Sequence, residues 1–440
     1  MNIKFRLTVM SFLQFFVWGA WLTTLGTYGF SYKQWSSAEF GLVFSTMGIA
    51  SIFMPALMGI VADKWINAEK LYGILHICYG ITLFLLAGTN DPEIFFWILL
   101  LGMCFYMPTL ALSNAISYKL LKDQNYDVVK AFPPIRVFGT IGFIAAMWLT
   151  NIFSDQKSFS EFGIQAGNAI AGLFGNSINA NQFYFGAITA VFLGIFGFML
   201  PKCPPPRLIS KNATIAQKLG LDAFKLFADK KMALFFIFCM FLGAALQLTN
   251  MYGDTFLKDF GDIPQYAAST VVQYSTMIIS ISQISETLFI LAIPFFLKKI
   301  GIKKVMLISM FAWVLRFGFF SLGDAEGFGL MLIILSNIVY GMAFDFFNIS
   351  GSLFVESSTS AKIRSSAQGL FMMMTNGFGA ILGSVISGYV IGKYFMRADG
   401  TKDWHDIWLA FAVYALIVAL LFAVLFKHKH QPQKVETITH

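Results

Sequence analysis

Residues 280–296 read SISQISETLFILAIPFF, and this stretch decides the kind of fold that the chain adopts. It lies in a run without a basic residue between Lys258 and Lys298, which is long enough for the about 20 apolar residues of a membrane-spanning helix. Glu286 stands inside the stretch, with Gln283 one helical turn earlier on the same face. Because a carboxylate in hydrocarbon is costly unless it faces a cavity or a partner, Glu286 is predicted to be functional. The alternative is a helix-packing hydrogen bond or a lone salt bridge.

The composition of the whole chain agrees with a membrane environment. Hydrophobic residues make up 57% of the 440 residues and charged ones 12%, and the mean hydropathy is +0.69, whereas soluble domains carry about 25% charged residues. The sequence therefore predicts an all-α polytopic membrane protein. Its first span has no convincing cleavage site and is expected to be retained. The twelve predicted spans begin near Arg6, Glu39, Leu71, Ile94, Val129, Gln182, Met232, Ala268, Lys304, Gly329, Ser365 and Ile407.

The basic residues predict the orientation of the spans. With both termini in the cytoplasm, 23 of the 31 Lys and Arg residues fall on the cytoplasmic side, as the positive-inside rule requires. The net charge of +8 is then a topological signal, and no nucleic-acid partner is expected. The four cysteines form no CxxC pair, so neither a metal site nor a disulfide is predicted.

A basic, proline-containing connector divides the chain. We expect an N-terminal six-helix bundle over residues 1–201, a cytoplasmic linker over 202–231, a C-terminal six-helix bundle over 232–427 and a cytoplasmic tail over 428–440. Part of the linker, Thr214 to Phe227, has the apolar pattern of an amphipathic helix.

Three matches between the halves predict an internal repeat. Spans one and seven share a Gly-Ala pair followed by Tyr-Gly at the same offset, spans four and ten share a tyrosine with an asparagine eight residues later, and spans two and eight share a proline near the end. The matched residues are Gly19 and Gly243, Tyr28 and Tyr252, Tyr106 and Tyr340, Asn114 and Asn348, and Pro55 and Pro294. Chance similarity among apolar segments is the alternative.

The loop after span two contains Gly59, Asp63 and Lys64 in the order GIVADK. Together with six plus six spans, cytoplasmic termini and a long central loop, this fragment resembles the loop signature of the major facilitator superfamily. The resemblance implies that Asp63 pairs with neighbouring helix ends and latches one conformation. The matching loop of the second half, from Lys298 to Lys304, has lost the acid.

Seven segments carry a closer resemblance. They are SFLQFFVWGAWLTTLG, FMPALMGIVADKW, FPPIRVFGTIGFI, FFIFCMFLGAALQLTN, SQISETLFILAIPFF, YGMAFDFFNISGS and SAQGLFMMMTNGFG. They are similar to the bacterial nucleoside:proton symporter family, to which the xanthosine permeases belong, over nearly the whole chain. The main departure is a Gly/Asn/Ser-rich insert between Asn151 and Asn181, expected on the periplasmic side and away from the substrate.

The resemblance implies a proton-coupled importer of purine and pyrimidine nucleosides. Such a transporter works by alternating access of two six-helix bundles, is driven by the proton gradient without a cofactor, and lies in the bacterial inner membrane. Its expected partners are a nucleoside, the proton and membrane lipid, and a monomer is expected.

Polar residues inside the predicted spans point to the same class of substrate. In this architecture the cavity lies near the bilayer midplane between the halves, and the C-terminal half supplies most of the polar side chains. Amides and a carboxylate suit the vicinal hydroxyls of a ribose, and aromatic faces suit a nucleobase. The positions that match the family's nucleoside-binding residues are Arg136, Thr140, Phe143, Gln247, Asn250, Gln283, Glu286, Tyr340 and Phe344. For the phenylalanines the alternative is packing, and for the amides a helix–helix hydrogen bond.

Proton coupling needs a carboxyl group whose proton affinity changes with its surroundings. Only Glu286 and Asp345 are placed well inside the predicted spans. We expect Asp345 to carry the proton or gate transport and Glu286 to bind substrate, with protonation of Glu286 in transit as a further role of that residue. Arg316 is a candidate counter-charge, with a structural ion pair as the alternative.

Three other functions are open to the sequence. A proton-coupled sugar or oligosaccharide permease of the same fold would use the same polar side chains. An intramembrane enzyme is not expected, because the chain has no GxSxG or HExxH motif. A transporter-like sensor that binds substrate without moving it is the third.

Overall fold

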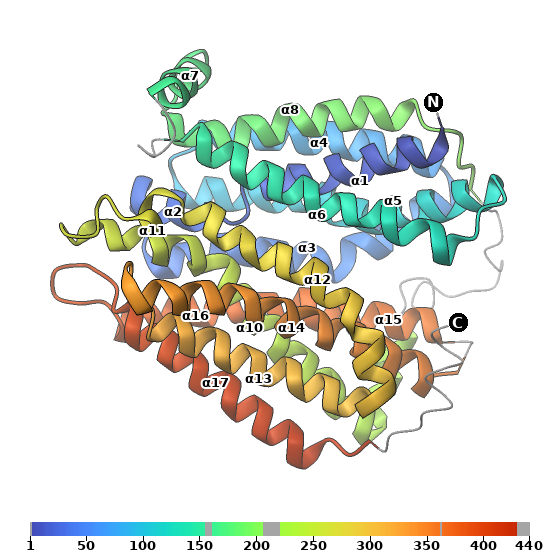
Figure 1. The fold of residues 1–440 in the computed structure, drawn as a ribbon. Helices are drawn as coiled ribbons and strands as arrows, with labels where there is room; N and C mark the ends of the chain where they lie inside the picture. The colour runs from blue at the N-terminus through green and yellow to red at the C-terminus, as the bar shows by residue number, and fades with distance from the viewer. Residues whose placement is uncertain (1, 155–160, 206–220, 361–362, 429–440) are drawn as a thin grey trace. The chain divides into compact units, whose positions relative to one another are not determined.

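The computed structural model describes residues 2–154, 161–205, 221–360 and 363–428, and within them no strand is formed (Figure 1). Eleven helices of this described part are long and apolar enough to cross a membrane, judged by length and composition. The remaining predicted span corresponds to α1 (Ile3–Gly19), which has 17 residues and is followed by a turn, α2 (Leu25–Thr27) and the π-helix η1 (Tyr28–Tyr32). The predicted all-α membrane fold is confirmed.

Contacts divide the chain into two compact units. Unit 1 comprises residues 1–35 and 49–219, and unit 2 comprises residues 36–48 and 220–440. The start of α3 groups with unit 2 because Gly41 packs closely against the backbone of Ser384 and Gly388. The predicted domain limits at 201, 231 and 427 stay a prediction. Much of the predicted linker helix lies outside the described residues, and its last residues belong to a 3-10 helix.

Unit 1 is built from long helices that pack in pairs. The helix α1 packs on α6, and α4 packs on both α5 and α8. The elements of this unit, with α3 shared between the two units, are α3 (Ser37–Lys64), α4 (Ala68–Ala87), α5 (Pro92–Asp123), α6 (Val128–Ile152), α7 (Glu161–Gly172), η2 (Ile178–Ala180) and α8 (Asn181–Phe198).

Unit 2 repeats this pairing. The helix α10 packs on η5 and α16, as α1 packs on α6 in unit 1. The helix α13 packs on both α14 and α17, as α4 packs on α5 and α8. These are the pairs that a six-span repeat predicts. Its elements are η3 (Leu221–Ala228), α10 (Lys230–Asp259), η4 (Phe260–Asp262), α11 (Thr270–Gln273), α12 (Ser275–Ile300), α13 (Ile302–Ser321), α14 (Gly327–Ser358), α15 (Arg364–Met372), the π-helix η5 (Met373–Gly379), α16 (Ala380–Tyr394) and α17 (Trp404–Leu425).

Acidic residues begin several of these helices. Asp91 precedes Pro92 and accepts hydrogen bonds from the backbone N–H groups of Glu93 and Ile94 at the start of α5. Asp229 and Asp403 cap α10 and α17 in the same way. Each carboxylate satisfies backbone donors that have no partner within the first turn, so the chain leaves its loops and enters the spans at defined residues.

The insert between Asn151 and Asn181 contains a helix, α7, that is not expected from the sequence. Figure 1 shows α7 set apart from the long helices of its unit, near the start of α8. Its small residues Gly163 and Gly167 pack against the backbone oxygens of Ile152 and Phe153 at the end of α6.

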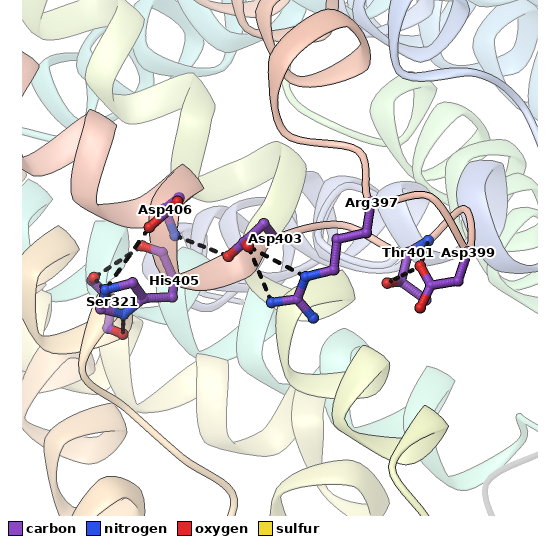
Figure 2. A network of polar contacts seen from close by, with 7 residues as sticks. All are labelled: Ser321, Arg397, Asp399, Thr401, Asp403, His405 and Asp406. Atoms are coloured by element: carbon purple, nitrogen blue, oxygen red, sulfur yellow. Dashed lines mark hydrogen bonds and ion pairs between the residues drawn. The ribbon is translucent and has the colours of Figure 1, made fainter.

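The loop between α16 and α17 is held by a polar network (Figure 2). Arg397 donates from Nε and Nη2 to Asp403 at 3.2 and 3.1 Å. The Ser321 hydroxyl donates to the His405 carbonyl, and Nδ1 of His405 contacts the Ser321 carbonyl, so these two residues join α17 to α13. The hydroxyl and the backbone N–H of Thr401 both donate to Asp399, and these bonds lower the pKa of the Asp399 carboxyl. The network fixes the way in which the last helix leaves the loop.

Candidate functional site

The C-terminal unit brings together most of the predicted substrate residues. Gln247 and Asn250 lie one turn apart on α10, Gln283 and Glu286 one turn apart on α12, and Tyr340, Phe344 and Asp345 on α14. These helices are neighbours, since α12 packs on α14 and α10 contacts α12. Tyr340 is also within electrostatic reach of both Glu286 and Asp345.

Two amide oxygens of this set are buried without a hydrogen-bond partner in the described part of the chain. They are the Oε1 atoms of Gln247 and Gln283. Gln247 as a whole is 8% exposed. A buried polar atom without a partner costs about 1–3 kcal/mol. Both amides can therefore accept hydrogen bonds from a polar ligand.

An aromatic surface accompanies the amides. The rings of Tyr340 and Phe344 are nearly parallel, with an interplanar angle of 16° and a centroid separation of 6.4 Å. They stand one turn apart on α14, and Trp313 supports Tyr340 edge-on at 5.8 Å. Such rings give a flat apolar face of the kind on which a planar heterocycle packs.

The two predicted proton-coupling acids differ in burial. Asp345 is 5% exposed, whereas Glu286 is half-buried. Arg316, the candidate counter-charge, is fully buried, and its guanidinium carbon lies 4.6 Å from the centroid of the Tyr340 ring. The counter-charge role stays a prediction.

Unit 1 places its three predicted residues on one face of α6. Arg136, Thr140 and Phe143 are all half-buried, at the spacing of successive helical turns. The Arg136 guanidinium carbon lies 3.9 Å from the centroid of the Phe15 ring, and the backbone of Phe143 packs directly on Gly19 of α1. The three side chains thus share a face that α1 holds in place.

The predicted latch residues lie at the end of α3. Asp63 is exposed and makes no hydrogen bond or ion pair with any described residue. Lys64 lies over the ring of Trp65 at 5.9 Å, and a β-carbon on Gly59 would meet nothing within 4 Å. The latch role stays a prediction.

Asp254 of α10 is a buried acid that was not predicted from the sequence, since Glu286 and Asp345 were expected to be the only acids well inside the spans. It is 2% exposed and accepts hydrogen bonds from the hydroxyls of Ser275 and Thr276 at 2.8 and 2.9 Å. Because α10 extends to Asp259, Asp254 lies within this helix. It stabilises the N-terminus of α12, where negative charge is favourable.

A second overlooked feature is a buried polar network in unit 1. Gln14 donates to Thr109 at 2.9 Å and accepts from the Tyr72 hydroxyl at 2.6 Å, and the Tyr106 hydroxyl donates to the Gln14 carbonyl at 2.8 Å. His76 contacts the Tyr72 carbonyl through Nδ1 at 3.0 Å. Gln14, a polar residue inside the first apolar span, was one signal in the sequence for this network.

The geometry defines the class of the protein: two repeated units of apolar helices, with a polar and aromatic cluster inside the second, make a polytopic transporter of the major facilitator fold. The family model described as "Nucleoside H+ symporter" matches residues 1–431. This chain belongs to the nucleoside H+ symporter family.

Relatives with known names support this assignment. The nucleoside permease NupG of Escherichia coli is 49% identical over 442 residues, with all of both chains covered. The xanthosine permease of Escherichia coli is 49% identical over 445 residues, again with all of both chains covered. A crystal structure of the nucleoside transporter NupG matches with a TM-score of 0.85 and 50% identity, covering 98% of this chain and 100% of that one. These relatives are transporters, and they favour neither an enzyme nor a sugar permease.

Proposed function

We propose that this chain imports purine and pyrimidine nucleosides together with protons across the bacterial inner membrane, by alternating access and with both termini in the cytoplasm. Family membership supports nucleoside and proton as the transported pair. The single observation that carries the proposal from this chain itself is the pair of buried amide oxygens on Gln247 and Gln283, in the same unit as the nearly parallel rings of Tyr340 and Phe344.

The amides and Glu286 are assigned to the ribose. A ribose presents vicinal hydroxyls, which donate to amide and carboxylate oxygens and accept from amide N–H groups. The side chains of Gln247, Asn250, Gln283 and Glu286 offer both kinds of partner. Burial favours this match for Gln247 and Gln283, because a ribose hydroxyl would satisfy the buried Oε1 atom of each, which has no partner among the described residues.

The aromatic rings are assigned to the nucleobase. Tyr340 and Phe344 offer a flat face for it, and we propose that Phe143 packs against it as well, with Arg136 and Thr140 binding its polar edge. A guanidinium and a hydroxyl suit the exocyclic oxygens and ring nitrogens that purines and pyrimidines share.

Asp345 is assigned to proton coupling. It is more buried than Glu286, and desolvation favours the protonated form of a carboxyl group. A site that binds and releases a proton during the cycle needs such a carboxyl close to the substrate residues, and Asp345 directly follows Phe344.

Transport in proteoliposomes tests the proposal. Purified protein with an inwardly directed proton gradient is expected to accumulate labelled uridine and adenosine, and a protonophore is expected to abolish accumulation. Unlabelled nucleosides should compete with uridine, while free hexoses and disaccharides should not. Uptake blocked by sugars and indifferent to nucleosides would overturn the proposal in favour of a sugar permease.

A further inference from the structure

Arg316 of α13 is a buried cation that joins three other helices. Its side chain is 0% exposed. Nε donates to the Thr249 hydroxyl of α10 at 3.1 Å, and Nη1 donates to the Ser282 hydroxyl of α12 at 3.2 Å and to the Ser336 carbonyl of α14 at 2.9 Å. The Ser336 hydroxyl donates back to the Arg316 carbonyl at 2.8 Å. One guanidinium group therefore connects all three helices that carry substrate residues in this unit.

Each of these contacts stands next to a proposed nucleoside ligand. Thr249 lies between Gln247 and Asn250, and Ser282 directly precedes Gln283. The third partner, Ser336, is one helical turn before Tyr340. A shift of the guanidinium would thus move the amides on two helices.

The contact with Tyr340 is direct. The guanidinium carbon lies 4.6 Å from the centroid of the Tyr340 ring and 4.9 Å from that of Phe320, within the range of a cation–π interaction. Because Tyr340 is nearly parallel to Phe344, the guanidinium also sets the tilt of the proposed nucleobase surface.

The partners of Arg316 in the described part of the chain are hydroxyls, a carbonyl and aromatic rings. It makes no ion pair within 4.0 Å there, and its Nη2 atom has no hydrogen-bond partner among the described residues. These contacts use the planar fork of donors that arginine presents in fixed directions, which the point charge of lysine cannot reproduce. The geometry, more than the charge, is what this site requires.

We propose that Arg316 is a positioning residue for nucleoside binding: it orders the amides of α10 and α12 against the aromatic face of α14 without itself contacting the substrate. This inference rests on the proposed function. A positioning role and a counter-charge role make opposite predictions for lysine at this place. Lysine would restore a counter-charge, but its single ammonium cannot occupy the positions of both Nε and Nη1, so at least one of the three helices would lose its hydrogen bond.

Binding measurements on purified protein separate these roles. Uridine titrations on the wild type, Arg316→Lys and Arg316→Met should show a Kd weakened about tenfold or more in both variants, with little rescue by lysine. Thr249→Val and Ser282→Ala, which remove single acceptors, should each weaken binding about threefold. Adding Thr249→Val to Arg316→Met should cause no further loss, because both changes remove the bond between Arg316 and Thr249.

Stability and a matched control complete the test. Ser321→Ala lies at the far end of α13, where the hydroxyl bonds to His405 of α17 and to no other side chain among the described residues. It is expected to leave the Kd unchanged. If the wild type binds uridine and Arg316→Lys binds it with the same Kd, the inference is overturned. The same holds if Arg316→Lys has a lower melting temperature but an unchanged Kd. Should Arg316→Lys fail to purify as a monodisperse protein, unchanged affinity in Thr249→Val and Ser282→Ala would overturn it equally. No binding of uridine or adenosine by the wild type would instead overturn the proposed function.

Discussion

Gly19 of α1 lies directly against the backbone of Phe143 in α6: a β-carbon on Gly19 would stand 2.5 Å from the Phe143 carbonyl oxygen and 2.8 Å from its Cα. The repeat-related Gly243 of α10 meets the backbone of Thr375 in η5 in the same way. The Gly-Ala pair shared by spans one and seven is therefore a packing requirement, since only glycine lets the two backbones approach so closely.

Gly19→Ala is expected to destabilise the protein by about 1–3 kcal/mol through overpacking and to weaken nucleoside binding, because α6 must move at Phe143. The melting temperature and the uridine Kd of the purified variant measure the two effects. Gly318→Ala is the matched control, because a β-carbon there meets nothing within 4 Å and alanine favours a helix over glycine. Equal melting temperatures for the two variants would refute the packing argument.

Glu69→Ala is expected to cost about 1–3 kcal/mol of stability by leaving a buried donor without its partner. The Glu69 carboxylate is 2% exposed and accepts from the Cys203 backbone N–H at 2.7 Å and from the Asn67 amide at 3.0 Å, which ties the segment after α8 to the start of α4. Thermal unfolding in detergent measures the loss. The neighbouring Lys70 is exposed, so Lys70→Ala is the control and should change the melting temperature little. Equal melting temperatures for Glu69→Ala and Lys70→Ala would contradict the assigned role of Glu69.

The fold could be predicted from the sequence because hydropathy and basic-residue placement act over whole spans. Most predicted starts lie within a few residues of the observed helices, for example Met232 against Lys230 for α10, whereas Ala268 lies seven residues before α12 begins at Ser275. The helix α7 was not predicted, because Gly163, Gly167 and Asn168 disfavour helices locally. Its glycines instead fit against backbone oxygens at the end of α6, a tertiary effect that composition does not show.

The polar site could be predicted only in part. Amides and acids stand out in an apolar helix, so Gln247, Gln283 and Glu286 were identifiable. Serine and threonine do not stand out, since small polar residues are common where membrane helices pack. The hydrogen bonds of Arg316 to Thr249 and Ser282 could not be predicted from the sequence. Spacing along α13 does not indicate which residues of α10 and α12 lie beside it.

Glu286→Gln is expected to weaken uridine binding while the protein still inserts and purifies normally. Glutamine keeps the size of the side chain but loses the charge that strengthens a hydrogen bond from a ribose hydroxyl, and bonds to charged groups contribute about 1.5–3 kcal/mol. Because glutamine still accepts a neutral hydrogen bond worth about 0.5–1.5 kcal/mol, titration calorimetry should show a Kd weakened about five- to tenfold. Glu161→Gln, an exposed acid of α7, is the matched control. Unaltered affinity in Glu286→Gln would remove Glu286 from the site.

Asp345→Asn is expected to separate binding from proton-driven accumulation. Asparagine has nearly the same shape as a protonated aspartate but cannot exchange a proton, so a variant locked in this form should bind uridine with an affinity reduced by less than about tenfold. It should also exchange labelled for unlabelled uridine across the membrane, because exchange needs no net proton movement. Accumulation against a gradient should fall to the level reached with a protonophore. Counterflow and proton-driven uptake in the same proteoliposomes measure the two activities. Glu286→Gln serves as the comparison, because its main expected defect is weaker uridine binding. Normal accumulation by Asp345→Asn would refute proton coupling through Asp345 and leave Glu286 as the remaining proposed carrier.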